Sequence, residues 1–375
     1  RRPPRSTLFP CTTLFRSGSL AFWAAWTTLR EARLRGWRRR LPLVIGGWGS
    51  RGKSSVERMK AALFHGLGYK VLCKSTGCEA MLLLGIPGRD PVETFLYRPR
   101  DKATIVEQHL VLRTAADFGA QVTLYECMAL NPFYTHILQH AWMRDDLTTI
   151  TNTYPDHEDI QGPSGRDVAD VISVFCPTRG RLVTSEQHMT PVLRRRARSR
   201  DTALLPTGPE DWDLLPRDLL ARFPDQAYDR NVALVARLAT SLGVPHDVAL
   251  RAMADYLLVD LGAYKRYGPL PVDGRHLTFW NGCSANDRAS FLSNWQRAHL
   301  SEFDERSGHD RFLAVVFNNR ADRLARQAIF ARIAALDVHA DRIFLIGTNT
   351  APMADAIRAC LHTDLRARLL TLAAD

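Results

Sequence analysis

The stretch that most constrains the fold is Leu41 to Ser55, which reads LPLVIGGWGSRGKSS. The apolar run Leu43 to Ile45 predicts a short buried strand, glycines follow it, and Lys53 opens a segment with helical apolar spacing. Within it, Gly47 to Ser54 fits the phosphate-binding pattern G-x-x-x-x-G-K-[ST]. Backbone N–H groups of such a loop surround phosphate oxygens, and the following helix N-terminus adds positive potential. A nucleotide-phosphate site is therefore expected here, with a coincidental glycine-rich turn as the alternative.

The polar side chains of the loop suit a nucleoside triphosphate. Lys53 supplies a compact charge for the β- and γ-phosphates, and the Ser54 hydroxyl can bind Mg²⁺. The chain has only six Lys among its 50 basic residues, yet uses one in the loop and another at Lys74. An ammonium acts on phosphate as a point charge, unlike the planar guanidinium. The other residues expected to contact phosphates are Gly47, Gly49, Ser50, Arg51, Gly52 and Ser55.

Strands and helices alternate after the loop, which predicts a parallel α/β sheet. The expected strands are Tyr69 to Cys73, Val122 to Tyr125 and Leu147 to Thr151. Ligands bind such sheets at the carboxyl ends of the strands. The polar segments that follow these strands should therefore meet the phosphate loop: Lys74 to Gly77 as a turn, Glu126, and Asn152 to Asp159. We expect Pro87 to Asp101 to be a loop.

Two of these segments have the composition of a metal site. Glu126 follows an apolar strand, where nucleotide hydrolases and ligases place a Mg²⁺-binding carboxylate, although a helix-capping or salt-bridged Glu is the alternative. The loop NTYPDHED sets His157 beside the carboxylates of Asp156 and Glu158. A metal-binding His with neighbouring carboxylates fits this composition, and a merely solvated acidic loop is the alternative.

A second α/β unit is expected after a glycine- and proline-rich loop, Asp260 to Asp273, which we take as the domain boundary. This gives an ATP-binding central domain over 41–265 and a smaller domain over 270–375, which we expect to be truncated. Its expected strands are 277–280, 312–317 and 342–346. Asn281 to Asp287 ends the first of them, so its polar groups should face a crevice and could hold a base or ribose.

The net charge of +11 is concentrated at the N-terminus, where residues 1–40 hold ten Arg and one Glu. The remainder of the chain thus lacks the basic footprint of a nucleic-acid-binding protein. We expect residues 1–17 to be a non-native or disordered tail and 18–40 to be a basic, Trp-containing segment. Its apolar run, Ser19 to Trp26, is too short to span a bilayer. A remnant of a membrane anchor, an interfacial amphipathic helix and a helix packed on the domain all remain open.

The seven cysteines are scattered and do not indicate a metal site. Cys73 and Cys78 lack the C-x₂-C spacing and a second pair, which argues against zinc. Reduced cytosolic thiols are the simplest interpretation. The run Arg194 to Arg200 is expected to be a solvated helix face.

Taken together, the motifs resemble one family. GSRGKS resembles the G-T-x-G-K-[ST] loop of the Mur ligase superfamily, the ATP-dependent amide ligases of peptidoglycan and of folate polyglutamylation. More narrowly, the chain resembles the ligase subunits of poly-gamma-glutamate synthases, which make capsule-type polymers. The matching stretches follow the family order from residue 41 to the end: GSRGKSSVERM, KSTGCEAM, YECMALNP, TNTYPDHEDIQGP, NGCSANDRASFLSNW, FNNRADRLARQ and FLIGTNTAP.

The resemblance implies a phosphate-loop, parallel-sheet central domain followed by a smaller Rossmann-like domain, with ATP and Mg²⁺ bound. It implies catalytic roles for Lys53, Glu126 and His157, and a metal site formed by Ser54, Glu126 and His157. Further nucleotide contacts would come from Asn231, Lys265, Arg266, Asn281, Asn286 and Asp287. Tentative contacts to substrate would come from Lys74, Thr76, Asn152 and Asp156.

The implied reaction converts a carboxylate into an acyl phosphate, which an amine attacks to give an amide, ADP and phosphate. The substrate would be glutamate, joined through its γ-carboxyl to a growing polymer. Arg98, Arg100 and Arg113 are candidates for gripping carboxylates, with ordinary surface arginines as the alternative.

The family also implies a setting. Small membrane-protein subunits would be partners at the cytoplasmic face of a bacterial membrane, nucleic acid would not, and the piece at hand is expected to be soluble. A phosphate-loop ATPase or kinase with another acceptor is one alternative, and a nucleotide-binding subunit of a membrane complex is another. The chain departs from the family at one position. Mur ligases often carry a carbamylated Lys about fifteen residues past the His, and Ile172 occupies that position here.

Overall fold

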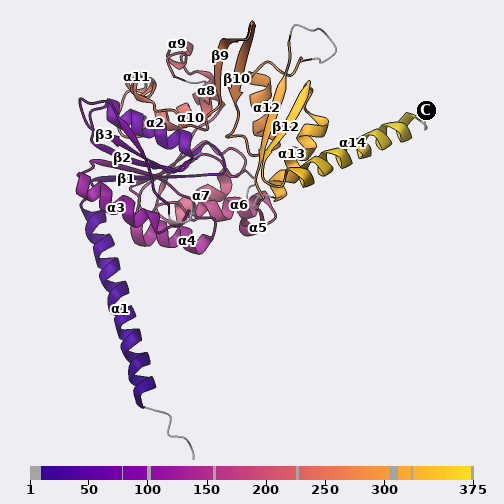
Figure 1. Cartoon of the computed structure of the whole chain (residues 1–375). Helices are drawn as coiled ribbons and strands as arrows, with labels where there is room; N and C mark the ends of the chain where they lie inside the picture. The colour runs from indigo at the N-terminus through magenta and orange to yellow at the C-terminus, as the bar shows by residue number, and fades with distance from the viewer. Residues whose placement is uncertain are drawn as a thin grey trace, which may run out of the picture. The chain divides into compact units, whose positions relative to one another are not determined.

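The computed structural model describes residues 10–77, 79–98, 103–154, 158–224, 228–303, 311–321 and 324–372. The chain divides into two compact units, Arg1–Leu261 and Gly262–Asp375. Each unit combines helices with strands (Figure 1), which confirms the predicted α/β class.

The first unit is built on an eight-stranded sheet in the order β4-β3-β2-β5-β1-β6-β7-β8. Strand β1 (Leu43–Trp48) lies in the middle, parallel to β5 (Val122–Glu126) on one side and to β6 (Leu147–Ile150) on the other. The strand pairs β2/β5, β6/β7 and β7/β8 are also parallel, whereas β3 pairs antiparallel with β2 and with β4. The bounds of the remaining strands are β2 Val71–Ser75, β3 Met81–Gly85, β4 Val92–Phe95, β7 Arg181–Thr184 and β8 Ala203–Pro206.

Helices cover both faces of this sheet (Figure 1). Successive residues of β1 point into different cores, Val44 into one and Ile45 into the other. This is expected for a parallel strand that is buried on both faces. On the Ile45 side lie α2 (Lys53–Gly66), α10 (Asp229–Ser241) and α11 (His246–Tyr256). On the Val44 side lie α3 (Glu107–Phe118), the π-helix η2 (Ile137–Met143), α6 (Gly165–Ser173) and α7 (Thr190–Ser199). Short connecting helices are α4 Pro132–His136, α5 Glu158–Gln161, α8 Pro209–Asp213 and α9 Arg217–Leu220.

Helix α1 (Pro10–Arg39) packs on the first unit only near its C-terminal end. Leu34 is buried there, and Arg38 donates to the carboxylate of Asp146 at 2.9 Å. The preceding turns extend away from the sheet (Figure 1) and expose the large side chains of Leu20, Phe22, Trp23 and Trp26. Over the part of the chain that the structure describes, no helix is both long and apolar enough to cross a bilayer.

The second unit contains two separate strand pairs. Strands β9 (Lys265–Val272) and β10 (Arg275–Asn281) form an antiparallel hairpin, and β11 (Ala314–Asn319) pairs in parallel with β12 (Arg342–Gly347). Around the parallel pair lie α12 (Arg288–Arg297), α13 (Leu324–Leu336) and α14 (Thr350–Leu372). A small core holds this part together, consisting of Phe317, Ala334 and Met353 with Phe291 and Phe330 packed against them.

Strand β9 corrects the expectation of a loop over residues 260–273. Its prolines, Pro269 and Pro271, are tolerated because the strand is exposed along its whole length and pairs with β10 alone in the described sheet. Asp273 and Gly274 have positive φ of 47° and 74°, which suits the two-residue turn of a hairpin. The Asp-Gly pair was the signal in the sequence. Because β10 belongs to this hairpin, the segment after it does not end a strand of the parallel pair.

Two further expectations for the first unit were wrong. The stretch from 87 to 101 is not only a loop, because β4 forms within it as an antiparallel edge strand. The expected polar turn at 74–77 begins inside a strand: Lys74 and Ser75 end β2 and are buried. Lys74 pairs with both β3 and β5, and Ser75 pairs with β3.

Candidate phosphate and metal site

The phosphate loop lies at the carboxyl end of β1, as the motif predicts. Gly49 and Gly52 have φ of 138° and 81°, a region that side-chain-bearing residues rarely adopt. Lys53 folds back over the loop, and its Nζ donates to the carbonyls of Gly49 at 2.8 Å and Ser50 at 3.2 Å. The ammonium is therefore held against the glycine turn that the motif assigns to phosphate.

Ser54 and Glu126 meet beside this loop, although 72 residues separate them in the sequence. The Ser54 hydroxyl donates to Glu126 Oε2 at 2.8 Å, and the backbone N–H of Thr76 donates to the same oxygen at 2.9 Å. Glu126 is only 2% exposed. A hydroxyl and a carboxylate are the oxygen ligands that Mg²⁺ prefers, so the chemistry of this pair fits a divalent cation.

Asn152 supports the phosphate loop from the adjacent strand end. Its Oδ1 accepts the backbone N–H of Arg51 at 2.9 Å, and its Nδ2 donates to the Arg51 carbonyl at 3.0 Å. Its own carbonyl accepts the N–H of Ser50 at 3.0 Å, and the Tyr154 carbonyl accepts the Ser50 hydroxyl at 2.5 Å. Both the oxygen and the nitrogen of the Asn152 amide are therefore engaged by the loop. The sequence had suggested that this side chain contacts substrate.

The remaining residues of the expected metal site belong to the loop that follows β6. Asp156 and His157 lie outside the described residues, and Glu158 opens α5. Among the residues that the structure does describe, no three His, Cys, Asp or Glu side chains gather closely enough to hold a metal ion. The metal-binding roles of Ser54, Glu126 and His157 therefore stay predictions. Ile172, where the family carries a carbamylated Lys, is a buried core residue of α6.

Lys74 and Arg98 share one carboxylate. Lys74 Nζ lies 3.2 Å from Glu107 Oε2, and Arg98 donates to both Glu107 oxygens at 2.8 and 3.1 Å. Burial lowers the pKa of Lys74, and Glu107 opposes that shift. Burial pushes the pKa of Glu107 upward, but its bond from Arg98 and the charge of Lys74 outweigh this and hold it below its usual value. Arg113 is an exposed residue 3.6 Å from Asp117, and Arg100 lies outside the described residues.

Asn231 lies against the last glycine of the loop. A Cβ added to Gly52 would lie 2.9 Å from the amide atoms of Asn231, which is buried. Its neighbour Arg230 stacks over the Trp212 ring, with 4.8 Å from guanidinium carbon to ring centroid. An adenine-binding role for Asn231 stays a prediction, and the structure brings its side chain to the phosphate loop.

The expected nucleotide residues of the second unit lie on the hairpin and at the start of α12. Lys265 and Arg266 lie over the Tyr267 and Trp280 rings, at 5.2 and 5.9 Å from the centroids. Asn281 accepts the backbone N–H of Cys283 at 3.1 Å. Asp287 caps α12 by accepting the Ser290 N–H at 2.9 Å, and Asn286 precedes it.

Sequence reasoning missed a buried ion pair beneath the loop. Glu57 and Lys60, both 0% exposed, lie 2.5 Å apart on α2, and Lys60 also donates to Thr149 Oγ1 at 3.0 Å. Burial raises the pKa of Glu57, and the charge of Lys60 opposes that shift. A Cβ on Gly47 would fall 1.8 Å from Glu57 Oε1, so the glycine makes room for the pair.

A second buried carboxyl occupies the opposite face of β1. A Cβ on Gly46 would fall 2.1 Å from Asp145 Oδ2. Asp145 accepts the Tyr125 hydroxyl at 2.7 Å and the Gln139 amide at 3.0 Å, and burial raises its pKa to about 7. Consecutive glycines inside a strand often mark close approach of other groups, and this was the signal available in the sequence.

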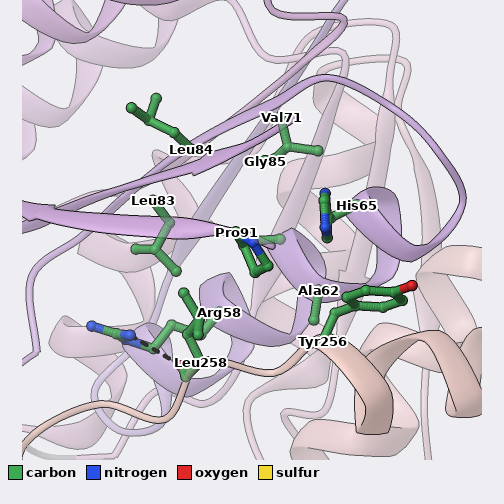
Figure 2. A pocket seen from close by; sticks show the side chains of 11 residues that line it. Arg58, Ala62, His65, Val71, Leu83, Leu84, Gly85, Pro91, Tyr256 and Leu258 are labelled. Atoms are coloured by element: carbon green, nitrogen blue, oxygen red, sulfur yellow. Dashed lines mark hydrogen bonds between the residues drawn. The ribbon is translucent and has the colours of Figure 1, made fainter. Parts of the chain in front are cut away.

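A cavity behind α2 is too small for a substrate. It has a volume of about 10 Å³, room for one water molecule, and its lining is mostly apolar. Figure 2 shows it between α2, the β2–β3 strands and α11, with Arg58, His65 and Tyr256 at its edges. The candidate functional site remains the surface formed by the phosphate loop and Glu126.

Comparison with known proteins finds relatives of one kind. Residues 267–374 match the family model of the poly-gamma-glutamate synthase CapB C-terminal domain. The chain is 29% identical over 317 residues to PGA synthase CapB of Bacillus subtilis, covering 84% of this chain and 77% of that protein. It is 28% identical over 323 residues to the capsule biosynthesis protein CapB of Bacillus anthracis, covering 84% of this chain and 65% of that one. The chain is similar in sequence to both CapB proteins over 84% of its length.

Solved structures extend the likeness to the fold of folylpolyglutamate synthases. The Mycobacterium tuberculosis enzyme complexed with ADP has a TM-score of 0.61 at 16% identity, covering 90% of this chain and 83% of that one. The Thermotoga maritima enzyme has a TM-score of 0.57 at 13% identity, covering 91% and 88%. The chain therefore shares the fold of these two enzymes, which agrees with the expected Mur-ligase-type α/β fold.

Proposed function

We propose that this protein is an ATP-dependent amide ligase that joins glutamate through its γ-carboxyl, forming poly-gamma-glutamate. The observation that carries the proposal is the meeting of Ser54 and Glu126 beside a glycine loop that encloses Lys53. The names of the CapB relatives, a PGA synthase and a capsule biosynthesis protein, supply the class of product.

The reaction proceeds in two transfers. A γ-carboxylate oxygen of glutamate attacks the γ-phosphorus of ATP, the bond to the bridging oxygen breaks, and ADP leaves with an acyl phosphate remaining. The amine of a second glutamyl unit then attacks the acyl carbon, the phosphate leaves, and the nitrogen loses a proton. Charge builds up on the transferred phosphoryl group, and Lys53 with the loop N–H groups stabilises it. Mur-type ligases must also exclude water from the acyl phosphate, since hydrolysis would waste it.

A divalent cation, which we take to be Mg²⁺, would bind through Ser54 and Glu126, and through His157 of the neighbouring segment. Such an ion would supply positive charge that offsets the charge of the phosphates and polarises the transferred group. The chain's own contribution is visible in the hydrogen bonds of Glu126: the Thr76 N–H fixes one carboxylate oxygen beside the Ser54 hydroxyl. That orientation keeps the carboxylate aimed at the loop.

Lys74, Thr76 and Arg98 lie on the side of Glu126 away from β1, where the glutamyl substrate would approach. Lys74 is buried and paired with Glu107, whereas Arg98 is partly exposed and pairs with the same carboxylate. Arg98 is the side chain of this cluster that we assign to the carboxylates of the substrate. In the second unit we assign nucleotide contacts to Lys265, Arg266, Asn281, Asn286 and Asp287, as the family resemblance implies.

We further propose that helix α1 places the enzyme at the cytoplasmic face of a membrane, next to small membrane-protein subunits. The support is an apolar, aromatic stretch followed by basic residues: Trp23 and Trp26 are 65% and 54% exposed, and Arg30, Arg33 and Arg35 follow. Aromatic side chains and Arg suit an anionic lipid surface. Flotation with anionic vesicles should retain the chain and lose a Trp23→Ser/Trp26→Ser variant; equal retention of both would refute this part.

The catalytic proposal is tested by glutamate-dependent ADP release. Lys53→Ala should abolish release, since the phosphates lose their main side-chain charge. Lys70→Ala is the matched control. Lys70 lies over the Phe118 ring at the amino end of β2, whereas the site lies at the carboxyl ends of the strands, so the variant should leave the rate unchanged. ADP release that ignores glutamate would favour an ATPase, and a phosphorylated small-molecule product would favour a kinase.

A further inference from the structure

Glu186 is a buried carboxylate that the chemistry above does not use. It lies two residues after the end of β7 and is 2% exposed. Thr153 donates to its Oε2 twice, through the backbone N–H at 2.6 Å and the hydroxyl at 3.0 Å. The backbone N–H groups of His188 and Met189 donate to its Oε1 at 2.8 and 2.9 Å. Four donors thus surround one side chain.

The two ends of this carboxylate belong to different elements. His188 and Met189 lie at the start of α7, where Met189 is the N-cap residue and provides no side-chain cap of its own. Glu186 therefore satisfies N–H groups that the helix leaves open. Its other oxygen reaches across to the segment after β6, which is the strand between β7 and β1. The carboxylate links the N-terminus of a helix to the loop next to the site.

Thr153 is the middle residue of the segment that supports the phosphate loop. On one side, Asn152 accepts the N–H groups of Ser50 and Arg51. On the other side, the Tyr154 carbonyl accepts the Ser50 hydroxyl. The segment is held by Glu186 at its centre and holds the phosphate loop at both ends. It also leads directly into Asp156 and His157 in the sequence.

A second bond joins the same two strand ends. Ser185, next to Glu186, donates its hydroxyl to the Thr151 carbonyl at 2.7 Å, and Thr151 donates to the Arg51 carbonyl at 2.6 Å. The end of β7 is therefore connected to the phosphate loop by two parallel chains of hydrogen bonds. Buried polar networks of this kind hold one geometry because each member needs its partner.

We infer that Glu186 is a positioning residue for ATP binding: it fixes the segment Asn152 to Tyr154 and, through it, the shape of the phosphate loop. The inference rests on the proposed function, in which ATP is the nucleotide at this loop. The position requires a carboxylate because all four partners are donors. A glutamine would place a donating NH₂ group opposite two of these donors, and the hydrogen bonds at that end of the side chain would be lost.

The test measures ATP affinity by calorimetry with Mg²⁺ and without glutamate. Glu186→Gln should weaken binding about tenfold, the lower end of the effect seen when a supporting partner of a binding residue is removed. Thr153→Val keeps the N–H and loses only the hydroxyl bond, so its effect should be smaller. Thr153→Ser restores that hydroxyl and should bind as the wild type does. Asp211→Asn is the matched control, because Asp211 caps α8 by accepting the Gly208 N–H at 2.7 Å.

Hydrogen exchange supplies a readout that does not depend on ATP. The amides of Ser50 and Arg51 should exchange faster in Glu186→Gln than in the wild type, and at the wild-type rate in Asp211→Asn. Wild-type ATP affinity together with wild-type exchange in Glu186→Gln would overturn the inference. If that variant does not fold, Thr153→Val decides instead, and unchanged affinity and exchange there would overturn it. Failure of the wild-type chain to bind ATP would count against the proposed function, while the exchange comparison would still test the link.

Discussion

Gly47 is the first residue of the phosphate-binding motif, and its lack of a side chain makes room for the buried Glu57 carboxylate. Its φ is not in the left-handed region, so Ala is allowed by the backbone. An added Cβ would lie 1.8 Å from Glu57 Oε1 and 3.1 Å from Thr149 Oγ1. Real contacts are at least about 3 Å, so the carboxylate would have to move by more than about 1 Å, and Lys60 lies 2.5 Å from it.

Gly47→Ala should therefore destabilise the protein by displacing a buried ion pair. Overpacking a core costs about 1–3 kcal/mol, and disrupting a buried pair costs about 3–5 kcal/mol when one charge is left uncompensated. We expect a loss of about 3 kcal/mol or more from the free energy of unfolding. In a Glu57→Ala/Lys60→Met background the carboxylate is gone and both charges are removed. There the same substitution should cost less than about 1 kcal/mol, since only the contact with Thr149 remains.

The assay is urea denaturation followed by circular dichroism, with each glycine variant compared in its own background. The difference between the two costs is the coupling between Gly47 and the pair. Gly36→Ala serves as the control, because nothing lies within 4 Å of a Cβ there and the residue is inside α1. Equal costs of Gly47→Ala in both backgrounds would refute the reasoning, since the carboxylate would then not be what excludes the side chain.

Three other predictions follow from buried polar contacts. Ser54→Ala should raise the Mg²⁺ concentration needed for half-maximal ADP release about tenfold, with Ser199→Ala, whose hydroxyl bonds the Arg196 carbonyl, as an unaffected control. Burial raises the pKa of Asp145 from 3.8 to about 7, so the folded state holds a proton that the unfolded chain releases, and stability falls as pH rises through this window. Relative to Asp145→Asn, wild-type stability measured by urea denaturation should fall by at most about 4 kcal/mol between pH 4 and pH 7, and parallel pH profiles would contradict this. Arg58→Met should cost about 3 kcal/mol of unfolding free energy, because Arg58 pairs with Glu93 and with Asp260 at 3.3 Å, whereas Arg113→Met on the surface should cost almost nothing.

The phosphate loop and the parallel sheet could be predicted because their signals are local. A short apolar strand, a glycine turn and Lys53 lie within fifteen residues, and each fits the others. The position of Glu126 followed from one rule, that parallel strands end on the same edge. The structure places it 2.8 Å from the Ser54 hydroxyl, as that rule implies.

The strands that were missed share a physical cause. Strand β9 is exposed over its whole length and contains two prolines, so neither apolar alternation nor β-propensity marks it. Strand β4 lies at the edge of the large sheet and, in the described part of the chain, pairs with β3 alone. Edge strands need less apolar character than central ones because they are less buried. The Asp273–Gly274 turn was the more reliable sign, since its chemistry does not depend on burial.

The task of a polar residue was harder to predict than its place. Asn152 and Lys74 were expected near the site and lie there, but each is already engaged: Asn152 by Arg51, Lys74 by Glu107. Their partners come from segments 101 and 33 residues away, a separation across which composition and spacing carry no signal. Nothing in the sequence indicated the role of Glu186, for the same reason. Its bonds to Thr153 form only because β7 lies beside β6 in the sheet. Asn152 and Glu186 thus hold the backbone around the phosphate loop, and substitutions at these two residues should change ATP affinity before they change the chemistry.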